Sequence, residues 1–529
     1  MKRILRPFNV ALFFASLLMM QCTDDSKKRF EDPPWLGGTN IETLEKGEKY
    51  TQFLALMDKA EYRTSIENQL FTLFVPSDSA FDAYLQKNGM SSVEELSREQ
   101  AEELFAQHIL INPRSREQLL YEYAWEVLET PEGEYGTLFH KKQTYSLPID
   151  YFEEVKYNKT FQGQTLQIYR GRTLIPLFTT EYFNDYFGDP SGSDYLFMYP
   201  NSSWSGTQWH DAMVLNFEGT ASGFIYYLDK VVEPIPTIET YLKNNQDKYG
   251  VFYDIAQQFA DYVNASINEK NERRYQKTYV GISDFACEEG PARGDPQNML
   301  YSFSAYIPTD NVLQEYLNNT VLKTYPDMLS VPELFKVYLL QSHIKTRLDL
   351  PSKIQKRFLN YYGDNVEIDI NNDIHEVIMC SNGPVYVINR ILEPNAFTCV
   401  PGPLFFNKSY STFLYALEYS GVLTNLIKSD IDVTILAPSN DELNEMGIRQ
   451  NELDGVVNLE IRNSDGVWSS MADIDIEELV KNYIHFDLIE NFNGEGFLRM
   501  ESDNYIYYNN GEIQGGGNQV VNDHNTIVE

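Results

Sequence analysis

The chain contains little cysteine and few basic residues for its length. Only 4 of its 529 residues are cysteine, and this excludes a small fold held together by disulfide bonds. Acidic residues outnumber basic ones by 77 to 42, so the formal net charge is −35. A chain this acidic repels phosphate backbones, and no local basic patch offsets the repulsion, so we expect no nucleic-acid partner.

The remaining composition is typical of ordinary globular domains. Hydrophobic residues make up 43% of the chain and charged residues 22%, which supplies normal cores and is unlike a disordered protein. At roughly 100–200 residues per domain, the length predicts three or four domains. The composition also excludes a polytopic membrane protein.

The N-terminus resembles a bacterial lipoprotein signal. Lys2, Arg3 and Arg6 precede an uncharged, mostly apolar run, Val10–Met20, which is too short to span a bilayer of about 30 Å. The run leads to Cys22, and in such signals the cysteine becomes the acylated first residue of the mature chain. The alternative is an ordinary cleaved signal followed by an incidental cysteine.

The acidic segment after Cys22 resembles the export tag of surface-exposed lipoproteins in some Gram-negative bacteria. We therefore predict a signal peptide at residues 1–21, lipidation at Cys22 and an acidic tether at 22–37. The expected location is the outer membrane, with the protein anchored by lipid and exposed at the cell surface.

Three segments repeat one order of features. Each begins with an amphipathic helix, whose apolar residues are Phe53, Leu56, Met57 and Ala60, then Phe252, Ile255, Ala256 and Phe259, then Phe413, Ala416 and Leu417. A short apolar strand follows and ends at Pro76, Pro308 or Pro438, where a Ser or Thr caps a new helix. A helical stretch with a histidine comes next, and the first two segments close with a glycine-led strand.

These features resemble tandem fasciclin-type domains. The residues that match the boxes of that family are Pro76, His108 and Gly223, then Pro308, His343 and Gly383, then Pro438 and His485. The resemblance implies an α+β fold, a twisted β-sandwich or wedge with packed helices, in three domains at 38–236, 237–396 and 404–529. The family's members are extracellular interaction modules.

The repeats differ in length. The first has 115 residues between His108 and Gly223, against 40 between His343 and Gly383, so about 75 are extra. The second has about 30 extra residues between Phe252 and Pro308. The third has no closing strand, which we interpret as a sequence that stops before the native protein does. The alternative is a short C-terminus whose edge another element covers.

Few residues of the sequence suggest a catalytic or metal-binding site. The common hydrolase, nucleotide and zinc signatures are absent, and we predict no catalytic residue, cofactor or metal. The three box histidines lie among apolar residues, so we interpret them as core imidazoles bonded to the backbone. Cys287, Cys380 and Cys399 could form one disulfide or remain thiols. Asp185, Asp189 and Asp194 could hold calcium, but a solvated acidic loop fits their spacing better.

The extra segment of the first repeat is rich in aromatic residues between Tyr182 and Trp209. Aromatic faces beside small polar groups suit a sugar ring or a protein epitope. The predicted ligand-binding residues are Trp204, Trp209, Tyr195 and Tyr199. The alternative is that these aromatics pack the insertion onto its own domain or onto the second.

The first functional hypothesis is an adhesion or binding lipoprotein that recognises an extracellular protein or polysaccharide without turnover. The resemblance to fasciclin-type modules and the lipid tether favour it. The alternatives are an architectural envelope protein and, last, a hydrolase with a carboxylate pair in the insertion of the first repeat.

Overall fold

The computed structural model describes residues 38–121, 140–145, 150–169, 173–268, 271–286, 302–428, 431–453, 456–489, 491–514 and 520–522. The predicted signal peptide, Cys22, the tether and Cys287 lie outside these ranges. Among the described helices, none combines the length and the apolar character needed to cross a membrane.

The described residues form two compact units. The N-terminal unit contains 38–121, 140–145 and 173–235, and the C-terminal unit contains 150–169 and the described residues from 236 onward. The chain therefore leaves the first unit, contributes a segment to the second, returns, and leaves again. The second and third predicted domains lie together in the C-terminal unit, while the boundaries given above stay predictions.

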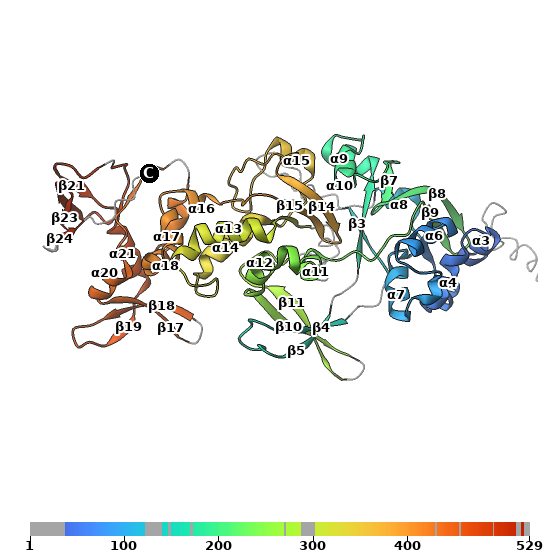
Figure 1. Cartoon of the computed structure of the whole chain (residues 1–529), viewed down its shortest axis with the longest axis horizontal. Helices are drawn as coiled ribbons and strands as arrows, with labels where there is room; N and C mark the ends of the chain where they lie inside the picture. Colours follow the sequence, from blue (N-terminus) through green and yellow to red (C-terminus); the bar gives the residue numbers. More distant parts are fainter. Residues whose placement is uncertain are drawn as a thin grey trace, which may run out of the picture. The chain divides into compact units, whose positions relative to one another are not determined.

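The N-terminal unit is built on a seven-stranded sheet (Figure 1). Its strands in spatial order are β2 (Ile109–Ile111), β1 (Phe71–Pro76), β9 (Gly223–Leu228), β8 (Ala212–Thr220), β7 (Thr207–Trp209), β6 (Leu174–Thr179) and β3 (Lys141–Gln143). Its helices are α3 (Asn40–Lys46), α4 (Thr51–Lys59), α5 (Arg63–Asn68), α6 (Asp78–Lys87), η1 (Val93–Glu95), α7 (Arg98–Ala106), α8 (Arg116–Tyr121), α9 (Thr180–Phe187) and α10 (Ser193–Met198).

The C-terminal unit contains five smaller sheets. Their strands are β10 (Ala260–Ile267), β11 (Arg273–Tyr279), β5 (Thr165–Tyr169) and β4 (Asp150–Glu154); β13 (Ile344–Lys345), β12 (Ser304–Pro308), β15 (Gly383–Ile388) and β14 (Ile374–Cys380); β16 (Thr434–Ile435) and β20 (Ile484–His485); β17 (Ile448–Leu453), β18 (Val456–Arg462) and β19 (Trp468–Ser470); β21 (Glu495–Arg499), β22 (Tyr505–Asn509), β23 (Glu512–Gln514) and β24 (Val520–Asn522).

Helices surround these sheets. They are α11 (Ile238–Asn244), α12 (Gln246–Gln257), α13 (Asp310–Asn319), η3 (Val321–Lys323), α14 (Glu333–His343), α15 (Pro351–Lys356), α16 (Asn395–Thr398), α17 (Gly402–Phe406), η4 (Lys408–Tyr410), α18 (Ser411–Tyr419), α19 (Leu423–Leu426), α20 (Asn440–Glu445) and α21 (Asp473–Lys481). The predicted amphipathic helices are α4, α12 and α18, and the α+β fold class is confirmed.

The three repeats share one strand register. In each, the residue three places before the box proline pairs antiparallel with the strand that follows α7, α14 or α21. The pairs are Leu73 with Ile109, Ala305 with Ile344, and Ile435 with Ile484. The residue one place earlier carries a hydroxyl that accepts a backbone N–H, at 2.7 Å from Arg114 to Thr72, 2.8 Å from Asp349 to Ser304 and 3.0 Å from Ile489 to Thr434.

The acidic or amide residue after each cap has a second partner that the sequence did not reveal. Its side chain accepts a backbone N–H at the start of α4 or α18, or, in α12, just after the kink at Tyr249 (φ −131°, ψ 17°) where the helix begins again. These bonds run from Gln52 to Asp78 at 2.8 Å, from Val251 to Asp310 at 2.8 Å and from Thr412 to Asn440 at 3.0 Å. The proline box therefore fixes two helix starts at once, because these N–H groups have no partner within their own helix.

A parallel strand closes the first two repeats. β1 pairs with β9 from Phe71 opposite Gly223 onward, and β12 pairs with β15 in the same way. Both glycines have positive φ, +140° and +139°, and an added Cβ would lie 1.8 Å from the Phe71 carbonyl oxygen or 1.9 Å from that of Phe303. Glycine is therefore required where each closing strand begins. In the third repeat, β16 pairs only with β20 among the described strands.

The two insertions meet in one sheet. β4 and β5 come from the extra segment of the first repeat, and β10 and β11 come from the extra segment of the second (Figure 1). β11 and β5 run parallel, with Tyr275 opposite Ile168. Their inner face joins a continuous core that extends from Val155 to Ile484.

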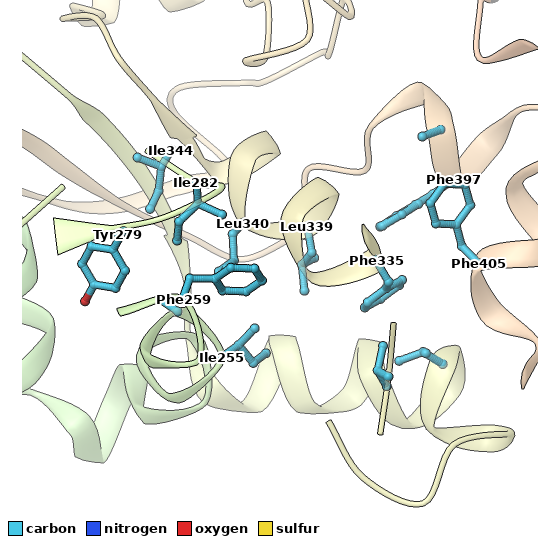
Figure 2. Close-up of a cluster of buried hydrophobic side chains, with 14 of the residues drawn as sticks. Ile255, Phe259, Tyr279, Ile282, Phe335, Leu339, Leu340, Ile344, Phe397 and Phe405 are labelled. Carbon is cyan, nitrogen blue, oxygen red and sulfur yellow. The ribbon is translucent and has the colours of Figure 1, made fainter. Parts of the chain in front are cut away.

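Figure 2 shows the middle of that core. Phe259, which follows α12, lies beside Leu340 of α14, with Tyr279 of β11 on its other side. Phe335 of α14 stacks on Phe397 of α16 at 4.9 Å between ring centroids. Aromatic stacking of this kind adds to the free energy gained by burial alone. The second and third repeats therefore share one core rather than two separate ones.

We predict that Gly383→Ala destabilises the C-terminal unit more than a glycine change without a clash. Gly363 also has positive φ, +85°, but an added Cβ there would have nothing within 4 Å. Gly363→Ala should cost about 1–2 kcal/mol from backbone strain, and Gly383→Ala should cost a further ~1–3 kcal/mol or more from the collision. Urea unfolding of both variants tests this, and equal losses would contradict the requirement for close strand approach.

Candidate binding surface and buried polar centres

The aromatic insertion of the first repeat folds onto its own unit. α9, α10, β6 and β7 bring together Phe178, Phe183, Tyr195, Tyr199 and Trp204, whose ring centroids lie 4.7–6.0 Å apart in contacting pairs. Tyr195 is fully buried in this cluster and Tyr199 is half-buried. Most of these aromatic side chains pack the insertion onto its own unit, as in the alternative given in the sequence analysis.

Trp209 lies in the core rather than on the predicted ligand surface. Its exposed fraction is 0%, its ring stacks on Phe74 at 3.7 Å and 10°, and its Nε1 donates to the Gln107 carbonyl oxygen at 2.8 Å. Trp209 packs on Phe74 within a buried hydrophobic cluster, so a ligand cannot reach it. Tyr195, in helix α10, is also fully buried and does not reach the surface.

Trp204 lies at the edge of the aromatic cluster and is partly exposed. It is half-buried, and its ring covers Gly192, where an added Cβ would lie 2.4 Å from Cδ2 of the indole. Phe183 and Tyr195 contact it from the protein side at 5.4 and 5.2 Å between centroids. One face of the indole therefore packs against the protein. The flanking Ser203 and Ser205 are exposed.

A polar group adjoins this cluster at the β7–β8 turn. His210 has φ +56°, its ring meets Tyr199 edge-on at 5.4 Å, and its Nδ1 lies 3.1 Å from Asp211 Oδ1. Lys230 Nζ lies 2.9 Å from the other oxygen of Asp211. Burial opposes ionisation of Asp211, but His210 and Lys230 outweigh it, so the pKa of this carboxyl falls well below its usual range.

The acidic loop beside the cluster is bonded internally. Asp189 accepts the Ser191 N–H at 2.9 Å as well as the hydroxyls of Ser191 and Ser193, and these bonds lower its pKa. Asp194 is buried, and the side chain of Asp185 is outside the described set. Among described residues, no three His, Cys, Asp or Glu side chains are placed to hold a metal ion.

His108 and His343 are core imidazoles with the same two partners. Nδ1 bonds the carbonyl four residues earlier, Leu104 at 2.9 Å or Leu339 at 2.8 Å. Nε2 accepts a backbone N–H just beyond the closing strand, from Val232 at 3.2 Å or Leu392 at 3.1 Å. The geometry makes Nδ1 the protonated nitrogen, and each ring ties the histidine box to the end of its repeat.

In the third repeat the structure places Tyr483, rather than His485, at this position. Leu436 N–H bonds the Tyr483 carbonyl at 2.9 Å, as Phe74 N–H bonds that of His108 at 2.8 Å. The Tyr483 ring meets Phe413 edge-on at 5.6 Å, as His108 meets Phe53 at 6.1 Å. His485 lies two residues later in β20, half-buried, with Nδ1 bonded to the Arg499 carbonyl. The shared strand register corrects the sequence alignment of this box by two residues.

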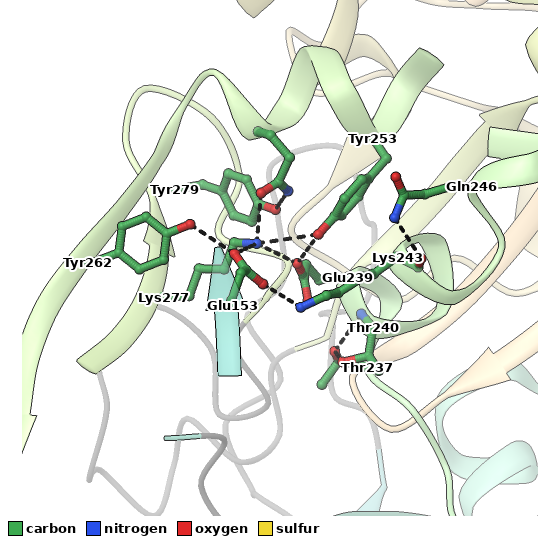
Figure 3. Close-up of polar contacts among 11 residues, drawn as sticks. Glu153, Thr237, Glu239, Thr240, Lys243, Gln246, Tyr253, Tyr262, Lys277 and Tyr279 are labelled. Carbon is green, nitrogen blue, oxygen red and sulfur yellow. Dashed lines mark hydrogen bonds and ion pairs between the residues drawn. The ribbon is translucent and has the colours of Figure 1, made fainter. Parts of the chain in front are cut away.

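A buried charge cluster joins the two insertions to the helices, and the sequence analysis missed it (Figure 3). Lys277 of β11 contacts Glu153 of β4 and Glu239 of α11, each at 2.7 Å, and the side chains of all three are at most 7% exposed. Lys243 contacts Glu153 from the other side at 2.5 Å. Two ammonium groups and two carboxylates make the cluster neutral, which is the condition under which buried charges are tolerated.

Tyrosine and glutamine side chains complete this cluster. Tyr262 donates to Glu153 and Tyr253 to Glu239, both at 2.8 Å, and Gln257 Oε1 accepts from Lys277 at 2.8 Å. Burial disfavours the charged form of Lys277, but Glu239 and Glu153 outweigh it and its pKa is raised. The alternation of Tyr275, Lys277 and Tyr279 along one strand face was the signal available in the sequence.

Cys380 and Cys399 do not form a disulfide bond with each other. Cys380 is buried, Cys399 is half-buried, and burial raises the pKa of the Cys399 thiol to about 11. A thiol of this kind is unreactive at neutral pH.

One protein family matches part of the chain. Residues 48–159 match the fasciclin domain, a range that contains Pro76 and His108 of the first repeat. Fasciclin domains are linked to cell adhesion and are generally non-enzymatic. Among solved structures, the chain is similar to a FAS1 domain pair from the insect cell adhesion molecule fasciclin I, at 12% identity and a TM-score of 0.21, over 64% of this chain and 92% of that chain. No curated protein matches.

We predict that Lys277→Met loosens the insertion sheet. Without the ammonium group, the buried carboxylates Glu153 and Glu239 would be only partly neutralised. Removing one partner of a buried ion pair lowers the free energy of unfolding by about 3–5 kcal/mol. Lys156→Met is the matched control, because Lys156 is 63% exposed in its ion pair with Asp254 and should cost less than about 1 kcal/mol. Amide hydrogen exchange at β4 and β5 measures both, and equal protection in the two variants would refute the role of the cluster.

We predict that the stability of both units falls between pH 6.5 and 4. Burial lowers the pKa of His108 and of His343 to about 4, so below pH 6.5 the unfolded chain binds protons that the folded chain excludes. Each histidine should remove about 2 kcal/mol of stability at pH 5 relative to pH 7. Urea unfolding across this range should give a steeper pH dependence for the unmodified chain than for His343→Gln, and identical slopes would count against the assignment.

Proposed function

We propose that the protein is a surface-displayed, lipid-anchored binding protein that holds an extracellular protein or glycan without converting it. The surface around Trp204 is the proposed contact. Recognition there requires a rigid apolar plane with hydrogen-bonding groups at its edge, which is the chemistry that sugar rings and protein epitopes share.

The placement of Trp204 is the observation that carries this proposal. The indole rests on Gly192 and on two buried aromatic rings, so little side-chain entropy is lost when a ligand covers it. Exposed Asn201, Ser203 and Ser205 adjoin it and offer amide and hydroxyl groups. A flexible surface tryptophan would lack this support.

The fasciclin match and the N-terminal sequence support the same role. A fasciclin domain in the first repeat favours adhesion, and a lipidated Cys22 would hold the repeats at the outer membrane. The buried carboxylates Glu153 and Glu239 are fully occupied by ammonium and hydroxyl partners, which favours a structural role for them over glycoside cleavage.

We predict that Trp204→Ala abolishes ligand retention while largely preserving stability. A glycan and extracellular-protein array, probed with the chain from Thr23 onward, identifies the ligand, and the variant should bind it at least about tenfold more weakly. Trp209→Ala is the matched control, because loss of a fully buried tryptophan should cost about 3–5 kcal/mol. Unchanged binding by Trp204→Ala would refute the proposed surface, and release of a shortened glycan would favour a hydrolase instead.

We predict that Cys22→Ala moves the protein from the membrane fraction to the soluble fraction. Acyl chains on this cysteine would provide the membrane affinity, at about 0.8 kcal/mol for each buried methylene. Fractionation of cells that express the unmodified chain and the variant measures the shift. Retention of the variant with membranes would contradict lipid anchoring at Cys22.

A further inference from the structure

The third repeat carries a three-stranded sheet, β17–β18–β19, between α20 and α21 (Figure 1). At the corresponding place, between α6 and α7, the first repeat has only the short helix η1. The second repeat has only η3 between α13 and α14. The three-stranded sheet is therefore an addition to the shared plan of the repeats.

One face of this sheet packs on the C-terminal unit. Ile448 and Leu459 are buried and belong to the continuous hydrophobic core. The hydroxyl of Tyr415 in α18 donates to the Val457 carbonyl oxygen at 2.6 Å. Because successive side chains of a strand point to opposite faces, the residues between these core positions point away from the core.

The strand register identifies the side chains of that outer face. Arg449 lies opposite Glu460, and Arg462 lies opposite Trp468. Residues paired in this way share one face of the sheet. The other described side chains of the outer face belong to Asn451, Asn458 and Ser470.

The indole of Trp468 is held in place by two guanidinium groups. That of Arg449 lies 4.0 Å from the centroid of the ring, and that of Arg462 lies 5.4 Å from it. Glu460 fixes Arg449 by accepting from its Nε at 2.9 Å and from its Nη2 at 2.7 Å. Asn451 donates to the other oxygen of Glu460 at 3.1 Å. These contacts orient the half-buried indole on a rigid sheet.

The charges on this face are not fully compensated. Arg449 has Glu460 as its partner, whereas among the described residues no carboxylate pairs with the exposed Arg462. Residues 404–529 contain 6 Lys and Arg against 22 Asp and Glu, so two of six basic residues contact one tryptophan in an acidic region. The planar fork of N–H groups on a guanidinium matches a carboxylate. Arg462 therefore offers a local site for an anion.

We infer that the outer face of β17–β18–β19 binds a hexuronate unit of an acidic polysaccharide. The carboxylate of the sugar pairs with Arg462, and the C–H groups of the sugar ring pack on the exposed part of Trp468. The amide of Asn451 and the hydroxyl of Ser470 lie on the same face and suit the sugar hydroxyls.

The composition of this face favours a sugar over a protein partner. Protein interfaces bury an apolar core, whereas Trp468 is the one apolar side chain among those described on the outer face. The inference does not rest on the surface around Trp204, because Trp204 belongs to the N-terminal unit and Trp468 to the C-terminal unit.

Titration calorimetry of the full chain with polygalacturonate, alginate and hyaluronan tests the ligand class. We expect saturable binding to at least one of them that weakens with added salt. The matched control is the same polysaccharide after reduction of its carboxyl groups, which should bind at least about tenfold more weakly. Absence of saturable binding to all three, or equal binding of the reduced form, would overturn the inference. Equal affinity for poly-L-glutamate would also overturn it, because charge alone would then be recognised.

Two variants locate the site. Arg462→Gln removes the exposed guanidinium and should lower the affinity at least about tenfold. Arg499→Gln is the matched control, because Arg499 is an exposed arginine of the same repeat, ion-paired with Asp503, and its loss should leave the affinity unchanged. Urea unfolding should give both variants the midpoint of the unmodified chain. Full affinity in Arg462→Gln, or an equal loss in Arg499→Gln, would overturn the inference.

Discussion

The ammonium group of Lys277 is buried only because carboxylates from two distant parts of the chain meet it. Glu153 arrives from the insertion of the first repeat, and Glu239 comes from the first helix after Ile235. A lysine in this position without both partners would have to lose its proton or the sheet would have to open. Burial of this charge cluster therefore requires that the two insertions pair with each other. The pairing makes a segment of the first repeat part of the hydrophobic core of the second.

The repeats themselves rest on a simpler rule. A short strand ends at proline, and its hydroxyl residue accepts a backbone N–H from the chain beyond α7, α14 or α21. The side chain of the residue after the cap accepts a backbone N–H of the amphipathic helix. The closing strand then requires a glycine at its start, and a buried histidine joins its end to the histidine box. Among the described residues, the third repeat keeps the parts of this rule that involve β20, and Tyr483 lies where the other two repeats have their buried histidine.

Local features of the sequence predicted the repeats well, because they depend on residues close together in the chain. Pro76, Ser77 and Asp78 define a strand end and a helix start without any distant partner. Residue type alone could not identify the third repeat's counterpart of His108. His108 lies four residues after Leu104, and the residue four places after Leu479 is Tyr483. Trp204 and Trp209 look alike in the sequence, and only the packing of Trp209 on Phe74 in the folded core distinguishes the buried residue from the partly exposed one. The meeting of the two insertions joins residues more than 100 positions apart, and no local pattern specifies such a contact.

The meeting of the two insertions places β4 and β5, which come from the first repeat, in a sheet of the C-terminal unit. The most direct test is an Ile168→Cys, Tyr275→Cys variant of the full chain, since these residues face each other between β5 and β11. Mild oxidation followed by mass analysis of proteolytic fragments should recover the two peptides as one linked species. Recovery of both cysteines as separately alkylated thiols would contradict the account.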